Sequence, residues 1–190
     1  MRRYLVALMT CSLFIFSGCG SILATMQVDT IEDDPGVRTL AQIIEDVNIE
    51  TKAVVNIHAA DEAFDDAHLA VVSYNGYVLL AGQVNSEALK ARATEVVRKV
   101  HGVRRIYNEI EVASPSSAMT RTSDTWITAK VKAWLLASSN VEGIRVKVVT
   151  ENGVVYLMGL ATRAEAARIA DKAAGISGVQ RVVRLFELLD

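Results

Sequence analysis

The chain has 190 residues, of which 51% are hydrophobic and 22% are charged, and its formal net charge is −2 at pH 7. These values are typical of a globular protein with one ordinary domain or two small ones. They exclude collagen-like and intrinsically disordered chains.

Residues 1–18 have the three parts of an export signal. Two arginines open the segment, an apolar run covers residues 4–16, and two small residues precede Cys19. A helix that crosses a bilayer needs roughly 20 apolar residues, so this run is too short to be a retained transmembrane anchor. We therefore predict a signal peptide that is removed from the mature protein.

The cleavage site resembles a lipobox, in which lipid is attached to a cysteine thiol and the peptide is cut just before it. The matching residues are Phe16-Ser17-Gly18-Cys19, although Phe16 stands where an aliphatic residue is usual. We predict that Cys19 carries covalent lipid and that residues 19–37 form a flexible spacer. The alternative is an ordinary signal peptide followed by a chance cysteine.

The same resemblance implies a cellular address. In such lipoproteins an aspartate after the cysteine causes retention in the inner membrane, whereas here Gly20 and Ser21 follow. The outer membrane, with the protein facing the periplasm, is the expected location. Cys11 leaves with the signal peptide and Cys19 is consumed by lipid, so no disulfide is expected.

An internal repeat covers most of the remaining chain. The segment NGYVLLAG at residues 75–82 aligns with NGVVYLMG at residues 152–159. Further along, the Gly-Val pair that begins at residue 102 aligns with the pair that begins at residue 178. We predict two copies of one domain, at residues 38–112 and 124–190, joined by a linker at residues 113–123.

The second copy shows most clearly how each domain begins. Apolar residues recur at helical spacing over residues 124–138, and Ser123 or Asp124 is the expected N-cap. A strand with alternating apolar residues follows at residues 144–149. Asn152-Gly153 then has the composition of a tight hairpin turn that leads into a second strand.

The rest of the copy predicts a second helix and a third strand. Thr162 and Glu165 have the spacing of a capping box at the start of the helix, and Gly178 ends it before a strand over residues 179–188. The order helix, strand, strand, helix, strand predicts an α+β domain with two helices packed on one face of a three-stranded mixed sheet.

These features resemble the BON domain, which also has the hairpin Asn-Gly, the strand-ending Gly82 and Gly159, and a Gly-Val pair before the last strand. A lipobox followed by two such domains, the second opening with DTWIT at residues 124–128, resembles the dual-BON outer-membrane lipoproteins of the division- and outer-membrane-stress-associated lipid-binding type. The resemblance implies two tandem BON domains without enzymatic activity. It also implies binding of anionic phospholipid, concentration at the division site and support of outer-membrane integrity.

In that family the lipid contact centres on the first helix of the second domain, which here corresponds to Trp126 to about Leu136. The internal repeat offers an independent comparison, because Asn48 corresponds to Trp126 and Asn56 to Trp134 when the first helices of the two copies are aligned. Both tryptophans of the chain therefore lie in this one helix. We predict that the phospholipid-binding residues are Trp126, Ile127, Lys130, Lys132, Ala133 and Trp134.

Trp126 and Lys130 are four residues apart and share a helix face, so an indole that prefers the headgroup region lies beside an ammonium group that can meet a phosphate. Residues 114–190 hold ten basic and seven acidic side chains, a modest excess that favours an anionic surface. The alternative is that Trp134 belongs to the core, Trp126 packs against the linker or the first domain, and the lysines are merely solvated.

A second functional class also fits the exposed indoles, namely a protein-interaction adaptor that docks the outer-membrane protein assembly machinery. The three histidines match no metal-binding motif, and no nucleophile elbow or glycine-rich phosphate loop is present. We expect no enzymatic activity, no metal, and no cofactor other than the covalent lipid on Cys19. An exported protein with this charge is not expected to bind nucleic acid.

Overall fold

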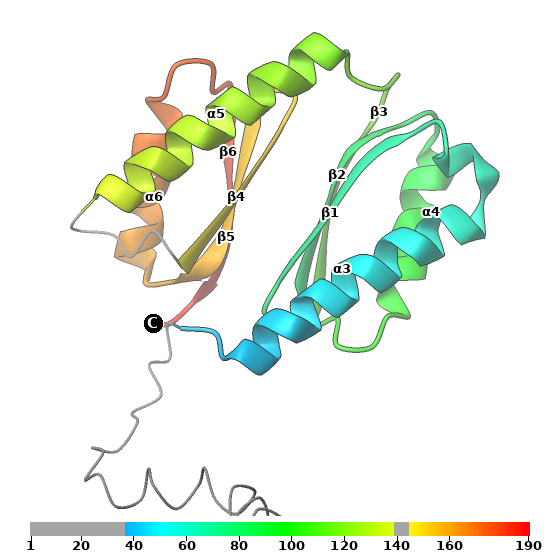
Figure 1. Cartoon of the computed structure of the whole chain (residues 1–190), viewed down its shortest axis with the longest axis horizontal. Coiled ribbons are helices and arrows are strands. Elements are labelled where there is room, and N and C mark those ends of the chain that lie inside the picture. Colours follow the sequence, from blue (N-terminus) through cyan, green and yellow to red (C-terminus); the bar gives the residue numbers. More distant parts are fainter. Residues whose placement is uncertain (1–36, 139–144) are drawn as a thin grey trace, which may run out of the picture. The chain divides into compact units, whose positions relative to one another are not determined.

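The computed structural model describes residues 37–138 and 145–190, in which one α+β domain occurs twice (Figure 1). The predicted signal peptide and Cys19 lie outside these residues. In the first domain the elements are α3 (Leu40–Ala60), the short 3-10 helix η1 (Glu62–Phe64), β1 (His68–Tyr74), β2 (Tyr77–Val84), α4 (Glu87–Arg98) and β3 (Arg105–Val112). In the second they are α5 (Ala118–Ala137), β4 (Val146–Glu151), β5 (Val154–Ala161), α6 (Arg163–Ala174) and β6 (Arg181–Leu188).

Each domain has one mixed sheet, as the order of elements predicted. The strand orders are β1-β2-β3 and β4-β5-β6. In each sheet the hairpin strands pair antiparallel, and the central strand pairs in parallel with the strand that follows the second helix. The predicted fold class is therefore confirmed.

The hairpins have the predicted turn geometry. Asn75 and Gly76 have φ values of 52° and 73°, and Asn152 and Gly153 have values of 51° and 76°. Two successive residues with positive φ form the tight turn that suits the twist of antiparallel strands, and Asn-Gly is the dipeptide that adopts it at least cost. The turn therefore fixes the register of the two hairpin strands in each sheet.

The first helix of the second domain begins earlier than the sequence predicted. Its N-cap is Ser117, whose side chain accepts a hydrogen bond from the Thr120 amide, so residues 118–123 are helical rather than part of a linker. The expectation that Ser123 or Asp124 caps this helix is wrong, because both lie inside it. The predicted cap of α6 is confirmed, since Thr162 Oγ1 accepts from the Glu165 amide at 3.2 Å.

A buried carboxylate joins the first helix to the hairpin in each domain. In the first domain, Asp46 of α3 accepts hydrogen bonds from the amides of Asn75 and Gly76 at 2.8 and 2.9 Å. It also accepts from the Ser73 hydroxyl at 2.7 Å and pairs with Arg38 at 2.6 Å. Asp46 is only 3% exposed, so these donors replace the water that the carboxylate loses on burial.

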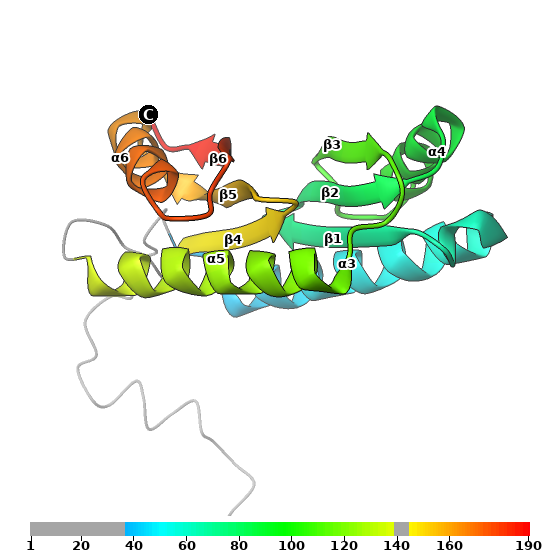
Figure 2. The same cartoon turned by 90° about the horizontal axis from the view of Figure 1, so that it is seen from above.

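The two helices of each domain cover the same face of its sheet (Figure 1), and Figure 2 shows α4 beside β3 and α6 beside β6. In the second domain α5 packs along β4 and α6 along β6. Alternate residues of the central strand enter this core, as Val155 and Leu157 do in β5. The side chains between them point to the other face, as the period of two in a strand requires.

Those remaining side chains form a core that both domains share. Leu79 and Ala81 of β2 belong to it together with Tyr156, Met158 and Leu160 of β5. Tyr156 is 2% exposed, and burial raises the pKa of its phenol to about 12, so the hydroxyl is neutral at physiological pH. Each sheet is thus buried on both faces, by its own helices and by the other domain.

Polar contacts border this shared core. Lys147 Nζ of β4 lies 2.6 Å from Glu50 Oε1 of α3, and the guanidinium of Arg104 donates to both carboxylate oxygens of Glu187 at 2.8 and 3.1 Å. The Asn75 side chain also donates to Glu187, at 2.6 Å. These pairs link residues that are between 83 and 112 positions apart in the sequence.

The hydrogen bonds to Asp46 predict how stability depends on pH. Burial alone would raise the pKa of this carboxyl, but the bonds from Gly76, Ser73, Asn75 and Arg38 outweigh burial and lower it below the ordinary value of 3.8. The ionised carboxylate therefore stabilises the fold fully above about pH 4, and this contribution is lost as the pH falls through the lowered value.

Urea unfolding between about pH 2 and pH 6 measures this effect. The free energy of unfolding should fall more steeply with acid in the unmodified protein than in Asp46→Asn, which has no carboxylate to titrate. Equal acid dependence in the two proteins would contradict the assignment.

Candidate membrane-binding helix

Helix α5 is oriented by four buried side chains on one of its faces, Asp124, Ile127, Val131 and Leu135. Three of them are aliphatic and join the core of the second domain. Asp124 is 5% exposed, and its Oδ2 and Oδ1 atoms accept hydrogen bonds from the amides of Asn152 and Gly153 at 2.9 and 2.8 Å. This carboxylate repeats the role of Asp46 and fixes the rotation of α5 about its axis.

The loop after α6 packs against the same helix. Gly178 has a φ value of 100°, and a Cβ atom at this position would lie 3.1 Å from the side chain of Ile127. A residue other than glycine would be strained there as well as crowded. The close approach brings the Ser177 carbonyl oxygen within 2.8 Å of Lys130 Nζ, which donates a hydrogen bond to it.

The opposite face of α5 carries an exposed apolar stripe. Met119, Trp126 and Leu136 are 83%, 66% and 72% exposed, and Ala129 and Ala133 are exposed between them. At 3.6 residues per turn these five side chains share one side of the helix. We call them the α5 stripe. Met119 was missed from the sequence because the helix was expected to begin at residue 124.

The structure divides the predicted binding residues into two groups. Trp126, Lys130 and Ala133 are exposed and lie on one side of α5, and Lys132 is exposed on a different side. Ile127 is 3% exposed in the core, so it has no surface with which to contact lipid in this conformation. Trp134 is half-buried and packs against the same core.

Helix α3 of the first domain also exposes apolar residues, which the comparison of the two repeats had not indicated. Leu40, Ile44, Val47 and Val55 are between 55% and 78% exposed. Both helices therefore expose apolar side chains, and they differ in the kind of side chain that is exposed. Helix α5 adds an exposed indole beside a cation, where α3 has Asn48 beside Lys52.

Metal sites and membrane-spanning helices are not found in the part of the chain that the structure describes. In residues 37–138 and 145–190, no three His, Cys, Asp or Glu side chains come together as a potential metal site. None of the helices in these ranges is long and apolar enough to cross a bilayer.

Comparisons with known proteins identify the class. The BON domain model matches residues 45–114 and 123–190. The chain is 35% identical over 173 residues to the outer membrane lipoprotein DolP of Haemophilus influenzae, which covers 91% of this chain and 86% of that protein. It is 34% identical over 148 residues to a 21 kDa hemolysin of Actinobacillus pleuropneumoniae, covering 78% of this chain and 76% of that protein.

The chain therefore belongs to the BON-domain family. More narrowly, it is a dual-BON outer-membrane lipoprotein similar to DolP. Among solved structures, CdsD of the type III secretion system of Chlamydia trachomatis matches 72% of this chain and 91% of its own, with 12% identity and a TM-score of 0.32. So low a score supports no functional comparison.

The contact between Asp124 and the hairpin predicts a large loss of stability in Asp124→Ala. The variant leaves two amide donors without their acceptor, and a hydrogen bond to a charged group contributes about 1.5–3 kcal/mol. We expect the free energy of unfolding to fall by about 3 kcal/mol in urea titration. The control is Asp171→Ala on the exposed side of α6, which should change it by less than about 0.5 kcal/mol. Similar values for the two variants would contradict the role of Asp124.

Proposed function

We propose that α5 of the second BON domain binds membrane surfaces that contain anionic phospholipid. The observation that carries this proposal is Trp126, a large aromatic side chain that is 66% exposed on a helix whose opposite face is core. Lys130 follows one turn later on the same side. The role is binding, with no catalytic step and no cofactor other than lipid on Cys19.

The α5 stripe, together with Lys130 beside it, has side chains that suit the headgroup region of a bilayer. An indole ring prefers the boundary between headgroups and acyl chains. Lys130 uses one of the three donors of its ammonium group on the Ser177 carbonyl, which leaves two for a lipid phosphate. Lys132 and Arg121 add positive charge elsewhere on the same helix.

The magnitudes favour weak and reversible binding. Burial of a large apolar side chain contributes roughly 1.5–3 kcal/mol, and each basic residue near an anionic surface contributes about 1 kcal/mol. A dissociation constant in the micromolar range needs about 8 kcal/mol, so the stripe of one helix is not a permanent anchor. Stable attachment would come from acylation of Cys19.

The two contacts would then have different tasks. The lipid on Cys19 would hold the protein at the periplasmic side of the outer membrane, while α5 would concentrate it where anionic phospholipid is enriched. We propose that the division site is such a place and that this recruitment supports outer-membrane integrity.

A protein-interaction adaptor is the second candidate. The observation that favours it is the exposed aliphatic surface of α3, at Leu40, Ile44, Val47 and Val55, which has no tryptophan. Such a surface suits a groove on a partner protein, for example in the outer-membrane protein assembly machinery. Photo-cross-linking in cells from positions 47 and 126 separates the candidates, because lipid adducts at 126 support membrane binding and protein adducts support the adaptor.

The membrane proposal predicts the behaviour of the chain from residue 27 onward, which lacks Cys19. This protein should sediment with vesicles of phosphatidylglycerol and phosphatidylethanolamine, and less with phosphatidylcholine alone. Trp126→Ala should weaken the binding at least about tenfold, because it removes roughly 1.4 kcal/mol or more of apolar burial. Lys130→Glu should also weaken it, since it replaces attraction to the phosphate by repulsion.

The matched control is Val47→Ala on the exposed side of α3, which should leave vesicle binding unchanged. If the unmodified chain does not bind anionic vesicles, or if Trp126→Ala binds as well as the unmodified chain does, the proposal fails.

A further inference from the structure

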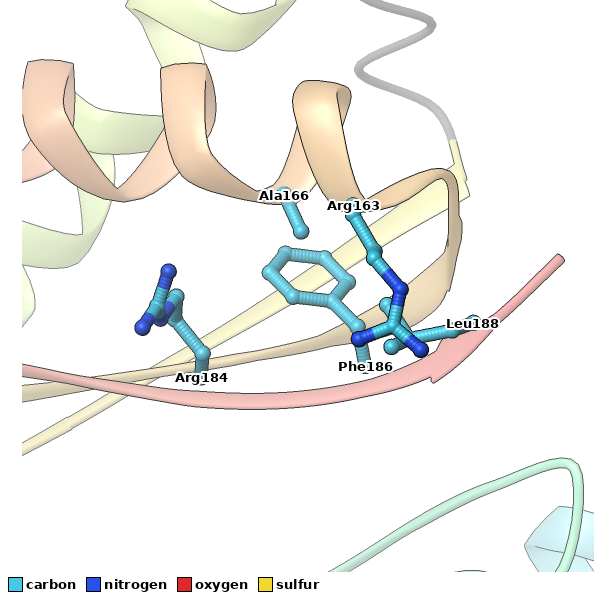
Figure 3. Close-up of a pocket in the computed structure, with 5 residues that line it drawn as sticks. All are labelled: Arg163, Ala166, Arg184, Phe186 and Leu188. Carbon is cyan, nitrogen blue, oxygen red and sulfur yellow. The ribbon is translucent and has the colours of Figure 1, made fainter. Parts of the chain in front are cut away.

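A cavity of about 270 Å³ lies in the second domain between the first turns of α6 and the edge strand β6. Arg163 and Ala166 of α6 line it on one side, and Arg184, Phe186 and Leu188 of β6 line it on the other. In Figure 3 the side chains of Arg163 and Arg184 lie on opposite sides of the Phe186 ring. The cavity therefore combines two cations with an apolar surface.

At the corresponding place in the first domain, hydrogen bonds join the helix α4 to the strand β3. When the two repeats are aligned, Arg184 corresponds to Asn108 of β3. The Asn108 side chain donates to the Lys90 carbonyl oxygen of α4 at 2.9 Å and to the Thr94 hydroxyl at 2.6 Å. Ala166 and Ala170 stand where that helix has Lys90 and Thr94, so the second domain has lost the hydroxyl and the amide that join helix to strand.

The charge at the cavity has changed as well. Arg163 corresponds to Glu87 of the first domain, and Arg184 replaces the neutral Asn108. The guanidinium groups of Arg163 and Arg184 have no hydrogen bond or ion pair with any of the described residues, 37–138 and 145–190. The backbone amide of Arg163 donates to Asp190 Oδ1 at 2.9 Å, so one carboxylate also lies at the start of α6, and the positive charge of the site comes from the two guanidinium groups.

We propose that this cavity binds a phosphate group, either free or in the headgroup of a phospholipid. One guanidinium group satisfies a carboxylate in a bidentate pair, whereas two guanidinium groups suit the larger number of oxygens and the higher charge of a phosphate. In a phospholipid, the apolar part next to the headgroup would lie on the Phe186 ring and on Leu188, which is 41% exposed.

The site is separate from the α5 stripe and does not depend on the function proposed above. Helix α5 packs along β4, whereas the cavity borders β6 at the other edge of the sheet. The ligand would enter as a single molecule between helix and strand, while α5 would meet an extended bilayer surface. Both a phospholipid headgroup and a free phosphate supply the required chemistry.

The test is a titration of the chain from residue 27, which includes the whole compact unit at residues 35–190. One probe is inorganic phosphate, and the other is short-chain phosphatidylglycerol below its critical micelle concentration. Amide chemical shifts along α6 and β6 report where each probe binds. Changes with phosphate alone identify free phosphate as a sufficient ligand, and changes with the lipid only identify the headgroup.

The double variant Arg163→Glu with Arg184→Asn introduces residues that the first domain already accommodates at these positions. It should reduce the affinity for the probes at least tenfold. Arg168→Ala, an exposed position elsewhere on α6, should not change it. The proposal is overturned if neither probe shifts α6 and β6, or if the double variant binds as the unmodified chain does.

Discussion

A buried carboxylate beneath an Asn-Gly turn is the interaction on which each domain depends. The two copies use the same atoms: one oxygen of Asp46 or Asp124 accepts from the asparagine amide of the turn, and the other accepts from the glycine amide. The turn points both amides to one side because its two residues have positive φ. These bonds add direction to the apolar packing of the helix and so fix its position and rotation against the hairpin.

That fixed rotation determines which residues of α5 reach the surface. With Asp124 under the turn and Ile127, Val131 and Leu135 in the core, Trp126 must point away from the domain. The same constraint acts on α3, which has an asparagine where α5 has Trp126. The fold therefore supplies the same exposed helix twice, and the side chains on it distinguish the two copies. The shared core of the two sheets leaves these helices, rather than the sheets, as the outer surfaces.

Local patterns were sufficient to predict the fold but not the whole site. The Asn-Gly hairpins, the Thr162 cap and the order of elements each depend on residues close in sequence, and each is confirmed. The start of α5 was misplaced because an aspartate near a helix terminus suits an N-cap as well as a tertiary acceptor, and its true partners lie 28 and 29 residues away. The match between Asp46 and Asp124 in the two repeats was the available signal. The spacing of Trp126 and Lys130 predicted their common face, whereas the bond from Lys130 to Ser177 and the cavity beside β6 depend on contacts between distant segments.

The central claim is that Trp126 enters the headgroup region when the protein binds an anionic membrane. The Trp134→Phe variant leaves Trp126 as the only indole, so its fluorescence can be followed during titration with vesicles that contain phosphatidylglycerol and lipids brominated near the headgroups. The account predicts a shift of emission to shorter wavelength together with quenching by the brominated lipids. Vesicle binding without any change in this emission would contradict it, because another surface would then make the contact.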